Sequence, residues 1–172
     1  MPKTGNWGRI LIPALILAGM WGSVALLKTS GLRVNWTASE PVGVYWLHPV
    51  TGPLHRGQRI EFCPPVSVSS FPFLMKGDCP GGAEHFIKSI AGVPGDIVTV
   101  TDLGVKINGV MLPGSRPSFH SHSDPSLFLP VLRGKFRLGT GQYWTYGSGS
   151  PGESFDSRYW GPISISAISG SA

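Results

Sequence analysis

The sequence predicts an all-β domain, an antiparallel barrel or sandwich, that follows one apolar amino-terminal segment. Glycine supplies 24 and proline 16 of the 172 residues, which excludes the long uninterrupted helices of a bundle or coiled coil. Six Trp, eight Phe and four Tyr need a core to bury them, which excludes a disordered chain. Short apolar or alternating runs, separated by glycine and proline, are typical of the strands of β-barrels and sandwiches.

The expected strands are short and are separated by turn signals. They are residues 42–47, 59–62, 86–91, 96–101, 105–107, 110–112, 136–138, 143–146 and 163–168. The clearest hairpin signal is Asn108-Gly109, because both residues accept a positive φ; Gly92-Val93-Pro94-Gly95 predicts another tight turn. Residues 64–84 and 113–133 lack strand periodicity, and such long irregular segments are usually functional loops or insertions.

The amino-terminal segment, residues 1–27, is expected to be a membrane anchor or signal segment. Between Arg9 and Lys28 no residue is charged over 18 positions, close to the length of about 20 that spans a bilayer. A cleaved signal peptide, with Ser23-Val24-Ala25 before the cut, and a buried core helix are the alternatives. The apolar region of a signal peptide is usually about 7–15 residues long, so an uncleaved transmembrane helix is favoured. As anchor or as signal, the segment makes residues 28–172 an exported domain.

The net charge of +5, from 14 Lys and Arg against nine Asp and Glu, does not point to nucleic acid. The basic residues are scattered singly, without the run or helical stripe that a nucleic-acid surface needs. We therefore expect no nucleic-acid partner.

Cys63 and Cys79 are the only two cysteines. They do not form a CxxC pair of the kind that binds metal, and in an exported domain a disulfide is the natural interpretation. A bond that closes a loop of this size stabilises a fold by about 3 kcal/mol in the chain-entropy model. Two free thiols are the alternative.

His120, His122 and Asp124 are side chains of the kind that bind metals. A metal needs three or four ligands, and no further cluster accompanies them, so a polar loop is the better interpretation. The chain also lacks the zinc-protease, phosphate-loop and GxSxG motifs. We expect no metal and no cofactor.

Ser39 and Lys88 form the sharpest candidate site. Ser39 stands just before Pro41 and Gly43, at the entrance to a strand. Lys88 shares one face of its strand with Phe86 and Ile90, where a lysine is unusual unless it is paired or functional; the alternative is a lysine whose stem reaches water at a sheet edge. A lysine activates a serine only when it is neutral, and an apolar face lowers its pKa from about 10.4 to the range that this needs. Such a dyad needs no histidine.

Four segments in order resemble the boxes of the signal peptidase I family, and most closely those of its conjugative-transfer branch, the TraF-type peptidases. They are Ser39-Glu40-Pro41-Val42-Gly43-Val44-Tyr45, Arg56-Gly57-Gln58-Arg59-Ile60-Glu61-Phe62, Phe86-Ile87-Lys88-Ser89-Ile90-Ala91-Gly92-Val93-Pro94-Gly95-Asp96 and Ser154-Phe155-Asp156-Ser157-Arg158-Tyr159-Trp160-Gly161. Two positions depart from the family pattern. Gln58 replaces an aspartate, and Gly147-Ser148-Gly149-Ser150-Pro151 stands where the family usually has Gly-Asp-Asn.

The resemblance implies that Ser39 is the nucleophile and Lys88 the general base. It also implies that Thr37, together with the Ser39 backbone N–H, forms the oxyanion hole, and that Ser154 orients the lysine.

In the TraF-type branch the aspartate that corresponds to Asp156 counts as catalytic. A carboxylate that touched Lys88 would raise the pKa of the lysine and oppose its work as a base. We therefore expect Asp156 to organise the site by pairing with Arg158. An ordinary ion pair that closes a loop is the alternative.

The resemblance further implies a membrane-anchored serine endopeptidase that processes an exported, pilin-like precursor through a Ser39 acyl-enzyme. The acceptor is water or, in a cyclisation, the precursor's own amino terminus. The protein would lie in the inner (cytoplasmic) membrane, with its catalytic domain facing the periplasm or the outside. The rival function is a non-catalytic, peptide-binding component of a secretion or pilus assembly machine. A cytosolic self-cleaving repressor is disfavoured by the apolar segment.

Overall fold

The computed structural model describes residues 12–17, 19, 21 and 30–172. Residues 12–17, 19 and 21 are helical. In this described part of the chain, no helix is both long enough and apolar enough to cross a membrane. Most of the predicted membrane segment, residues 1–27, lies outside the described residues.

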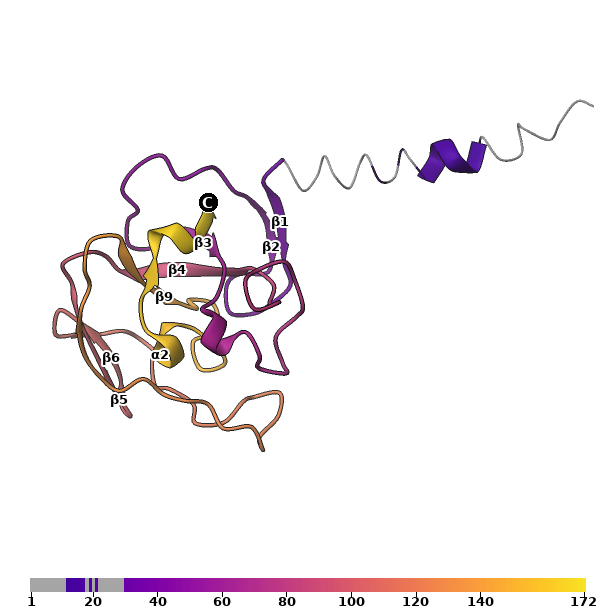
Figure 1. Cartoon of the computed structure of the whole chain (residues 1–172). Helices are drawn as coiled ribbons and strands as arrows, with labels where there is room; N and C mark the ends of the chain where they lie inside the picture. Colours follow the sequence, from indigo (N-terminus) through magenta and orange to yellow (C-terminus); the bar gives the residue numbers. More distant parts are fainter. Residues whose placement is uncertain (1–11, 18, 20, 22–29) are drawn as a thin grey trace, which may run out of the picture.

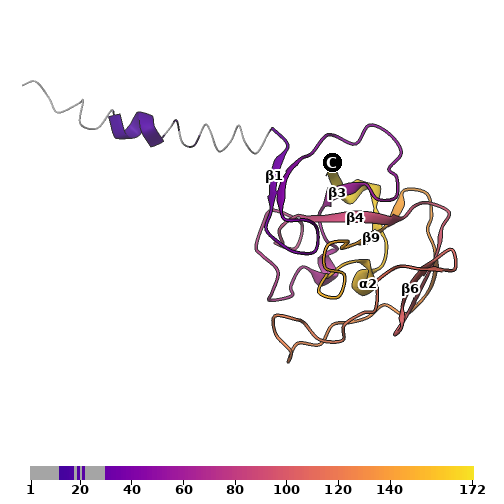
Figure 2. The ribbon, with the colours of Figure 1, turned by 180° about the vertical axis from the view of Figure 1, so that it is seen from behind.

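The domain is built from three antiparallel sheets. β1 (Leu32–Asn35) and β2 (Gly43–Trp46) form a two-stranded sheet, and a four-stranded sheet has the order β7-β6-β5-β8. The third sheet has five strands in the order β10-β9-β4-β3-β11. In both ribbon views the β1–β2 hairpin lies at one end of the domain and β6 at the other, with β4 and β9 between them (Figure 1, Figure 2). The prediction of a mainly β fold is confirmed.

The bounds of the remaining elements follow the chain. They are β3 (Arg59–Phe62), η1 (Val66–Val68), β4 (Phe86–Gly92), β5 (Ile97–Thr101), β6 (Gly104–Ile107), β7 (Val110–Met111), β8 (Gly134–Arg137), β9 (Gln142–Tyr146), α2 (Ser157–Trp160), β10 (Ile163–Ser164), η2 (Ile165–Ala167) and β11 (Ile168–Ser171).

Two of the predicted turns are present: one closes a hairpin, and the other connects two sheets. Asn108 and Gly109 have φ values of 52° and 86° and join β6 to β7 in a hairpin, as predicted. The Gly92-Val93-Pro94-Gly95 turn instead carries the chain from the five-stranded to the four-stranded sheet. At Gly92 a Cβ atom would lie 3.0 Å from the side chains of Leu138 and Trp144, so the chain crosses between sheets in close contact with these two side chains.

The strand predicted at residues 163–168 is interrupted by the 3₁₀ turn η2, so β10 and β11 pair with different partners. The irregular segments 64–84 and 113–133 contain no strand, only single bridges and η1.

The irregular segments are held by an aromatic cluster that also holds residues 154–161, the last of the four family segments, which we call the closing box. Phe155 lies 5.2 Å from Phe71, 5.1 Å from Phe73 and 5.0 Å from Trp160, measured between ring centroids. Val68, Leu129 and Tyr159 complete this buried cluster. Because Phe155 stands between Ser154 and Asp156, packing of the cluster fixes the backbone of both residues.

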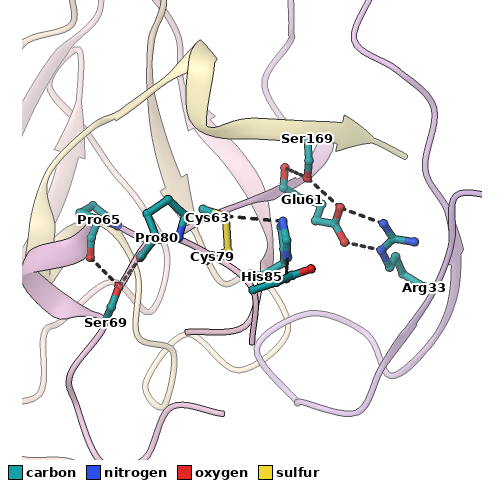
Figure 3. The surroundings of a disulfide bond; sticks show 10 residues. Arg33, Glu61, Cys63, Pro65, Ser69, Cys79, Pro80, His85 and Ser169 are labelled. Carbon is teal, nitrogen blue, oxygen red and sulfur yellow. Dashed lines mark hydrogen bonds and ion pairs between the residues drawn. A yellow bond between two sulfur atoms is a disulfide. The ribbon is translucent and has the colours of Figure 1, made fainter. Parts of the chain in front are cut away.

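A disulfide and an ion pair tie further segments to β3 (Figure 3). Cys63 and Cys79 are bonded, with their Cα atoms 5.4 Å apart, as the sequence predicts. The bond attaches the segment 64–84 to the end of β3. Two residues earlier, the buried carboxylate of Glu61 accepts hydrogen bonds from Arg33 of β1 and from Ser169 of β11, which docks the β1–β2 hairpin onto the five-stranded sheet.

Candidate active site

Ser39 lies in the connection between β1 and β2, and the side chain of Asn35 holds this connection. Asn35 is the last residue of β1 and is buried. Its Nδ2 donates to the carbonyl oxygens of Thr37, Glu40 and Pro41 at 2.9, 3.0 and 3.1 Å, and its Oδ1 accepts from the Thr37 backbone N–H. We call residues 37–41 the serine loop. One buried amide therefore fixes the backbone on both sides of Ser39.

The hydroxyl groups of the serine loop form a chain with a fixed direction. Thr37 Oγ1 lies 2.9 Å from Asn35 Oδ1 and 3.0 Å from Ser39 Oγ. An amide oxygen only accepts, so Thr37 donates to Asn35 and Ser39 donates to Thr37. In this arrangement Thr37 has no hydrogen left for an oxyanion. The Ser39 backbone N–H, by contrast, has no acceptor among the described residues.

Lys88 lies on the central strand β4, between β3 and β9, and only 6% of it is exposed. Its Nζ lies 5.7 Å from the centroid of the Phe86 ring, and Ile60, its fully buried partner on β3, stands opposite. Nζ has no hydrogen bond or ion pair with any residue in the described part of the chain. Because β4 is an interior strand of its sheet, a lysine at a sheet edge is excluded.

Burial lowers the pKa of Lys88 from 10.5 to about 8. The negative charges of Asp156 and, more weakly, Glu40 raise this pKa, and the positive charge of Arg158 lowers it. The desolvation penalty on the ammonium form is the largest of these effects. Lys88 is thus a lysine that can be neutral near physiological pH.

No hydrogen bond joins Ser39 Oγ to Lys88 Nζ in this structure, but Glu40 brings their two segments together. Glu40 follows Ser39, and its fully buried carboxylate accepts hydrogen bonds from the backbone N–H of Ser89 at 2.8 Å and from its hydroxyl at 3.1 Å. Ser89 follows Lys88 on β4. The serine loop is therefore docked on the strand that carries the lysine. Sequence reasoning missed Glu40, because a single glutamate in a turn gives no local signal.

The segment Gly147-Ser148-Gly149 closes the site from the other side. Gly149 donates to the Ser39 carbonyl at 3.0 Å, and Ser148 donates to Glu40 through its N–H and its hydroxyl, at 3.2 and 2.8 Å. A Cβ atom at Gly147 would lie 2.0 Å from Ser154 Oγ and 3.0 Å from the Ser39 carbonyl oxygen. These contacts brace the loop where the sequence departs from the Gly-Asp-Asn pattern.

Asp156 and Arg158 form a fully buried, two-point ion pair. Arg158 Nε donates to Asp156 Oδ1 at 2.8 Å and Nη2 donates to Oδ2 at 2.9 Å. Burial lowers the pKa of Arg158, but the charge and hydrogen bond of Asp156, together with Tyr159 and Tyr146, outweigh it, and the pKa is raised. Asp156 makes no hydrogen bond to Lys88 in the described structure and acts on it through space.

The same pair organises the loops around it. Asp156 Oδ2 accepts the Gly147 N–H at 3.0 Å. Arg158 donates to the carbonyls of Pro151 and Ser154 at 2.6 and 2.8 Å, and at 3.3 Å to that of Arg116. Its guanidinium also lies over the rings of Tyr146 and Tyr159. The pair joins three segments, which is more than an ordinary ion pair at a loop end.

Ser154 lies beside Gly147, and its buried hydroxyl has no hydrogen-bond partner among the described residues. The structure places it next to the serine loop without the expected bond to Lys88. The other polar candidates lie elsewhere: His120 packs on the Phe128 ring, His122 faces Glu153, and Asp124 accepts from Ser126.

An antiparallel β-domain that docks a serine loop beside a buried lysine, and that closes on a buried Asp–Arg pair, is of the signal-peptidase type. The chain belongs to the family described as signal peptidase, peptidase S26, which matches residues 4–172, and to its TraF-type branch. It is 38% identical over 162 residues to the plasmid transfer protein TraF of Escherichia coli, covering 90% of this chain and 85% of that protein.

It is also 33% identical over 146 residues to the conjugal transfer protein TraF of Agrobacterium tumefaciens (strain 15955), covering 81% of this chain and 79% of that protein. Among solved structures, a signal peptidase I from Enterococcus faecalis V583 matches 72% of this chain and 99% of its own, with a TM-score of 0.39 and 20% identity.

Proposed function

We propose that this chain is a membrane-anchored serine endopeptidase of signal peptidase type, with Ser39 as nucleophile and Lys88 as general base. The observation that carries the proposal is the lysine: it is buried on a central strand, has no hydrogen bond or ion pair with a described residue, and has a pKa lowered to about 8. At pH 7 about a tenth of such a lysine is neutral, against about one part in 3,000 at its ordinary pKa. A structural lysine gains nothing from this burial, whereas a general base needs it.

In the proposed reaction Lys88 takes the Ser39 proton and Ser39 attacks the scissile carbonyl. The scissile C–N bond then breaks, and the leaving amine takes the proton from Lys88, which gives the acyl-enzyme. The unpaired Ser39 N–H faces the oxyanion that forms. Thr37 holds the Ser39 hydroxyl before substrate binds, and the Asp156–Arg158 pair organises the loops around the lysine. The acyl-enzyme is then released by water or by the amino terminus of the precursor.

We propose that the domain works at the outer face of the cytoplasmic membrane, facing the periplasm. The disulfide supports an oxidising compartment. One face of the β1–β2 hairpin also supports contact with a bilayer: Val34 and Val44 pair across the strands, and Trp36, Val42 and Trp46 are 58–78% exposed. Exposed tryptophans and an apolar patch are typical of a membrane interface. This face flanks the serine loop, where an exported substrate would arrive.

The proposed substrate is an exported, pilin-like precursor. The relatives' names place them in plasmid and conjugal transfer, and an extended peptide could add beside an exposed strand. Product masses separate the two acceptors, because hydrolysis adds one water to the product and cyclisation does not.

The test is proteolysis by the full chain in detergent, with quenched-fluorescence peptides that carry small residues at P1 and P3, the preference that the resemblance to signal peptidases implies. Ser39→Ala and Lys88→Ala should each abolish cleavage, and so should Lys88→Arg, because a guanidinium stays charged. Lys106→Ala, which removes an exposed lysine of β6, is the matched control and should cleave normally. For the wild type, kcat/KM should rise with pH through a limb near pH 8, because only neutral Lys88 accepts the proton.

The absence of a Ser39–Lys88 hydrogen bond favours the rival, a non-catalytic peptide-binding component. Catalytic hydrogen bonds are often formed only once substrate is bound, so the assay decides between the two. A Lys88→Ala protein that keeps more than about a few per cent of wild-type cleavage, or a rate that is flat from about pH 5 to 10, would refute the dyad.

A further inference from the structure

We propose that Glu40 is a positioning residue for this reaction: its buried carboxylate holds the serine loop against the strand that carries Lys88. The inference rests on the proposed function for its consequence in catalysis, but the contacts that carry it are independent of that function.

The Glu40 carboxylate accepts five hydrogen bonds from three separate parts of the fold. Ser89 of β4 gives two and Ser148 gives two, and Arg59 Nε of β3 gives the fifth, at 3.1 Å. No part of Glu40 is exposed. A buried carboxylate without partners is strongly destabilising, so the serine loop is stable in this position only while these donors surround Glu40.

In the described structure no backbone–backbone hydrogen bond joins the serine loop to β4. The β1–β2 sheet is separate from the five-stranded sheet, and the bridge between His48 and Ser171 lies after β2. Ser39 itself is joined to the rest of the fold by the bond from Gly149 to its carbonyl oxygen. Within the described structure, Glu40 is the side chain of the serine loop that reaches β4, one residue beyond Lys88.

Glu40 also acts on Lys88 by charge. The charged groups that influence Lys88 are Asp156 and Arg158 from the closing box and Glu40 from the serine loop; Arg59 of β3 pairs with Glu40. The negative charge of Glu40 raises the pKa of Lys88, against the effect of burial. Removing the charge should therefore lower both kcat and the pKa of Lys88. Loss of packing alone would lower kcat without this fall in the pKa.

The experiment compares three variants of the full chain with the peptide assay above. In Glu40→Gln, kcat should fall about 10–100-fold with little change in KM, as expected for a nucleophile displaced by up to about an ångström. The acid limb of the pH–rate profile should move to lower pH. Ser148→Ala keeps the charge and removes one donor, so kcat should fall less and the limb should stay in place. Glu61→Gln is the matched control: it alters another buried carboxylate, paired with Arg33, which is not among the groups that shift Lys88. The acid limb of its pH–rate profile should lie at the same pH as in the wild type.

Two outcomes would overturn the proposal. In the first, Glu40→Gln has the kcat of the wild type and an acid limb at the same pH. In the second, Glu61→Gln moves the acid limb as far as Glu40→Gln does. If Glu40→Gln does not fold, Ser148→Ala carries the test, and an unchanged kcat there refutes positioning.

A second readout separates this proposal from the proposed function. A ¹³C NMR titration of the Lys88 side chain reports its pKa without any substrate. If the wild type does not cleave the peptides, the peptidase proposal fails, but a lower Lys88 pKa in Glu40→Gln still supports the contact. An unchanged Lys88 pKa overturns it.

Discussion

Replacing Lys88 by methionine should stabilise the fold while it destroys activity. Methionine has nearly the same length, is apolar and adapts to irregular space, so it fills the site between Phe86, Ile60 and Ile90. In the wild type, folding carries an ammonium group out of water at neutral pH. Lys88→Met removes that cost, and the size of the gain follows from the pKa.

The pKa of Lys88 is 10.5 unfolded and about 8 folded. Between these values the unfolded chain holds a proton that the folded chain has lost, so stability rises with pH. Below pH 8 both states are protonated and the full cost is present, about 3 kcal/mol for this pKa difference. The advantage of Lys88→Met should therefore be largest at pH 7, about 3 kcal/mol, and should shrink as the pH rises from 8 to 10.5.

The assay is urea unfolding of the full chain in mild detergent, followed by tryptophan fluorescence at pH 7 and at pH 10. The difference between variant and wild type cancels the other titrating groups, and the change of that difference with pH isolates Lys88 from any gain in packing. A stability difference that is equal at the two pH values would refute the assignment of a buried, destabilised ammonium group to Lys88.

Two further predictions concern the disulfide and Thr37. The double variant Cys63→Ser/Cys79→Ser should lose about 3 kcal/mol of unfolding free energy in urea; two free thiols in the oxidised wild type, found by alkylation and intact mass, would contradict the bond. Thr37→Val should lower kcat by less than about tenfold, because the Thr37 hydrogen is already donated to Asn35. A loss of about 10²–10³-fold, typical of a removed oxyanion donor, would instead show that Thr37 turns toward the oxyanion during the reaction.

The sequence predicts those parts of the fold whose information is local. The strand at residues 59–62 and the Asn108-Gly109 hairpin lie where pattern and turn chemistry place them. The sequence does not predict β1, because its Arg33 and Asn35 are polar; it is a strand through its antiparallel pairing with β2, and its two polar side chains bind Glu61 and the serine loop. α2 is a single turn that Asp156 caps, too short for any periodic pattern.

The residues of the site differ in the same way: some are identified by local sequence, and others only by long-range contacts. Ser39 and Lys88 can be found from local context and family boxes. Glu40 cannot, because its partners Ser89 and Ser148 lie 49 and 108 positions away. The direction of the Ser39 hydroxyl is likewise set by contacts of Asn35 that depend on how the loop closes.

The two carboxylates that act on Lys88 raise its pKa, and each of them is paired with an arginine. Asp156 and Glu40 are both fully buried, and an uncompensated carboxylate near Lys88 would keep the lysine protonated. Each has its own arginine: Arg158 binds Asp156 at two points, and Arg59 binds Glu40. Their hydrogen bonds still organise the serine loop and the closing box, while the positive charge of Arg158 lowers the pKa of Lys88 against the effect of Asp156. Desolvation therefore remains the dominant effect on Lys88, and the same polar network can hold the site in shape without disabling its base.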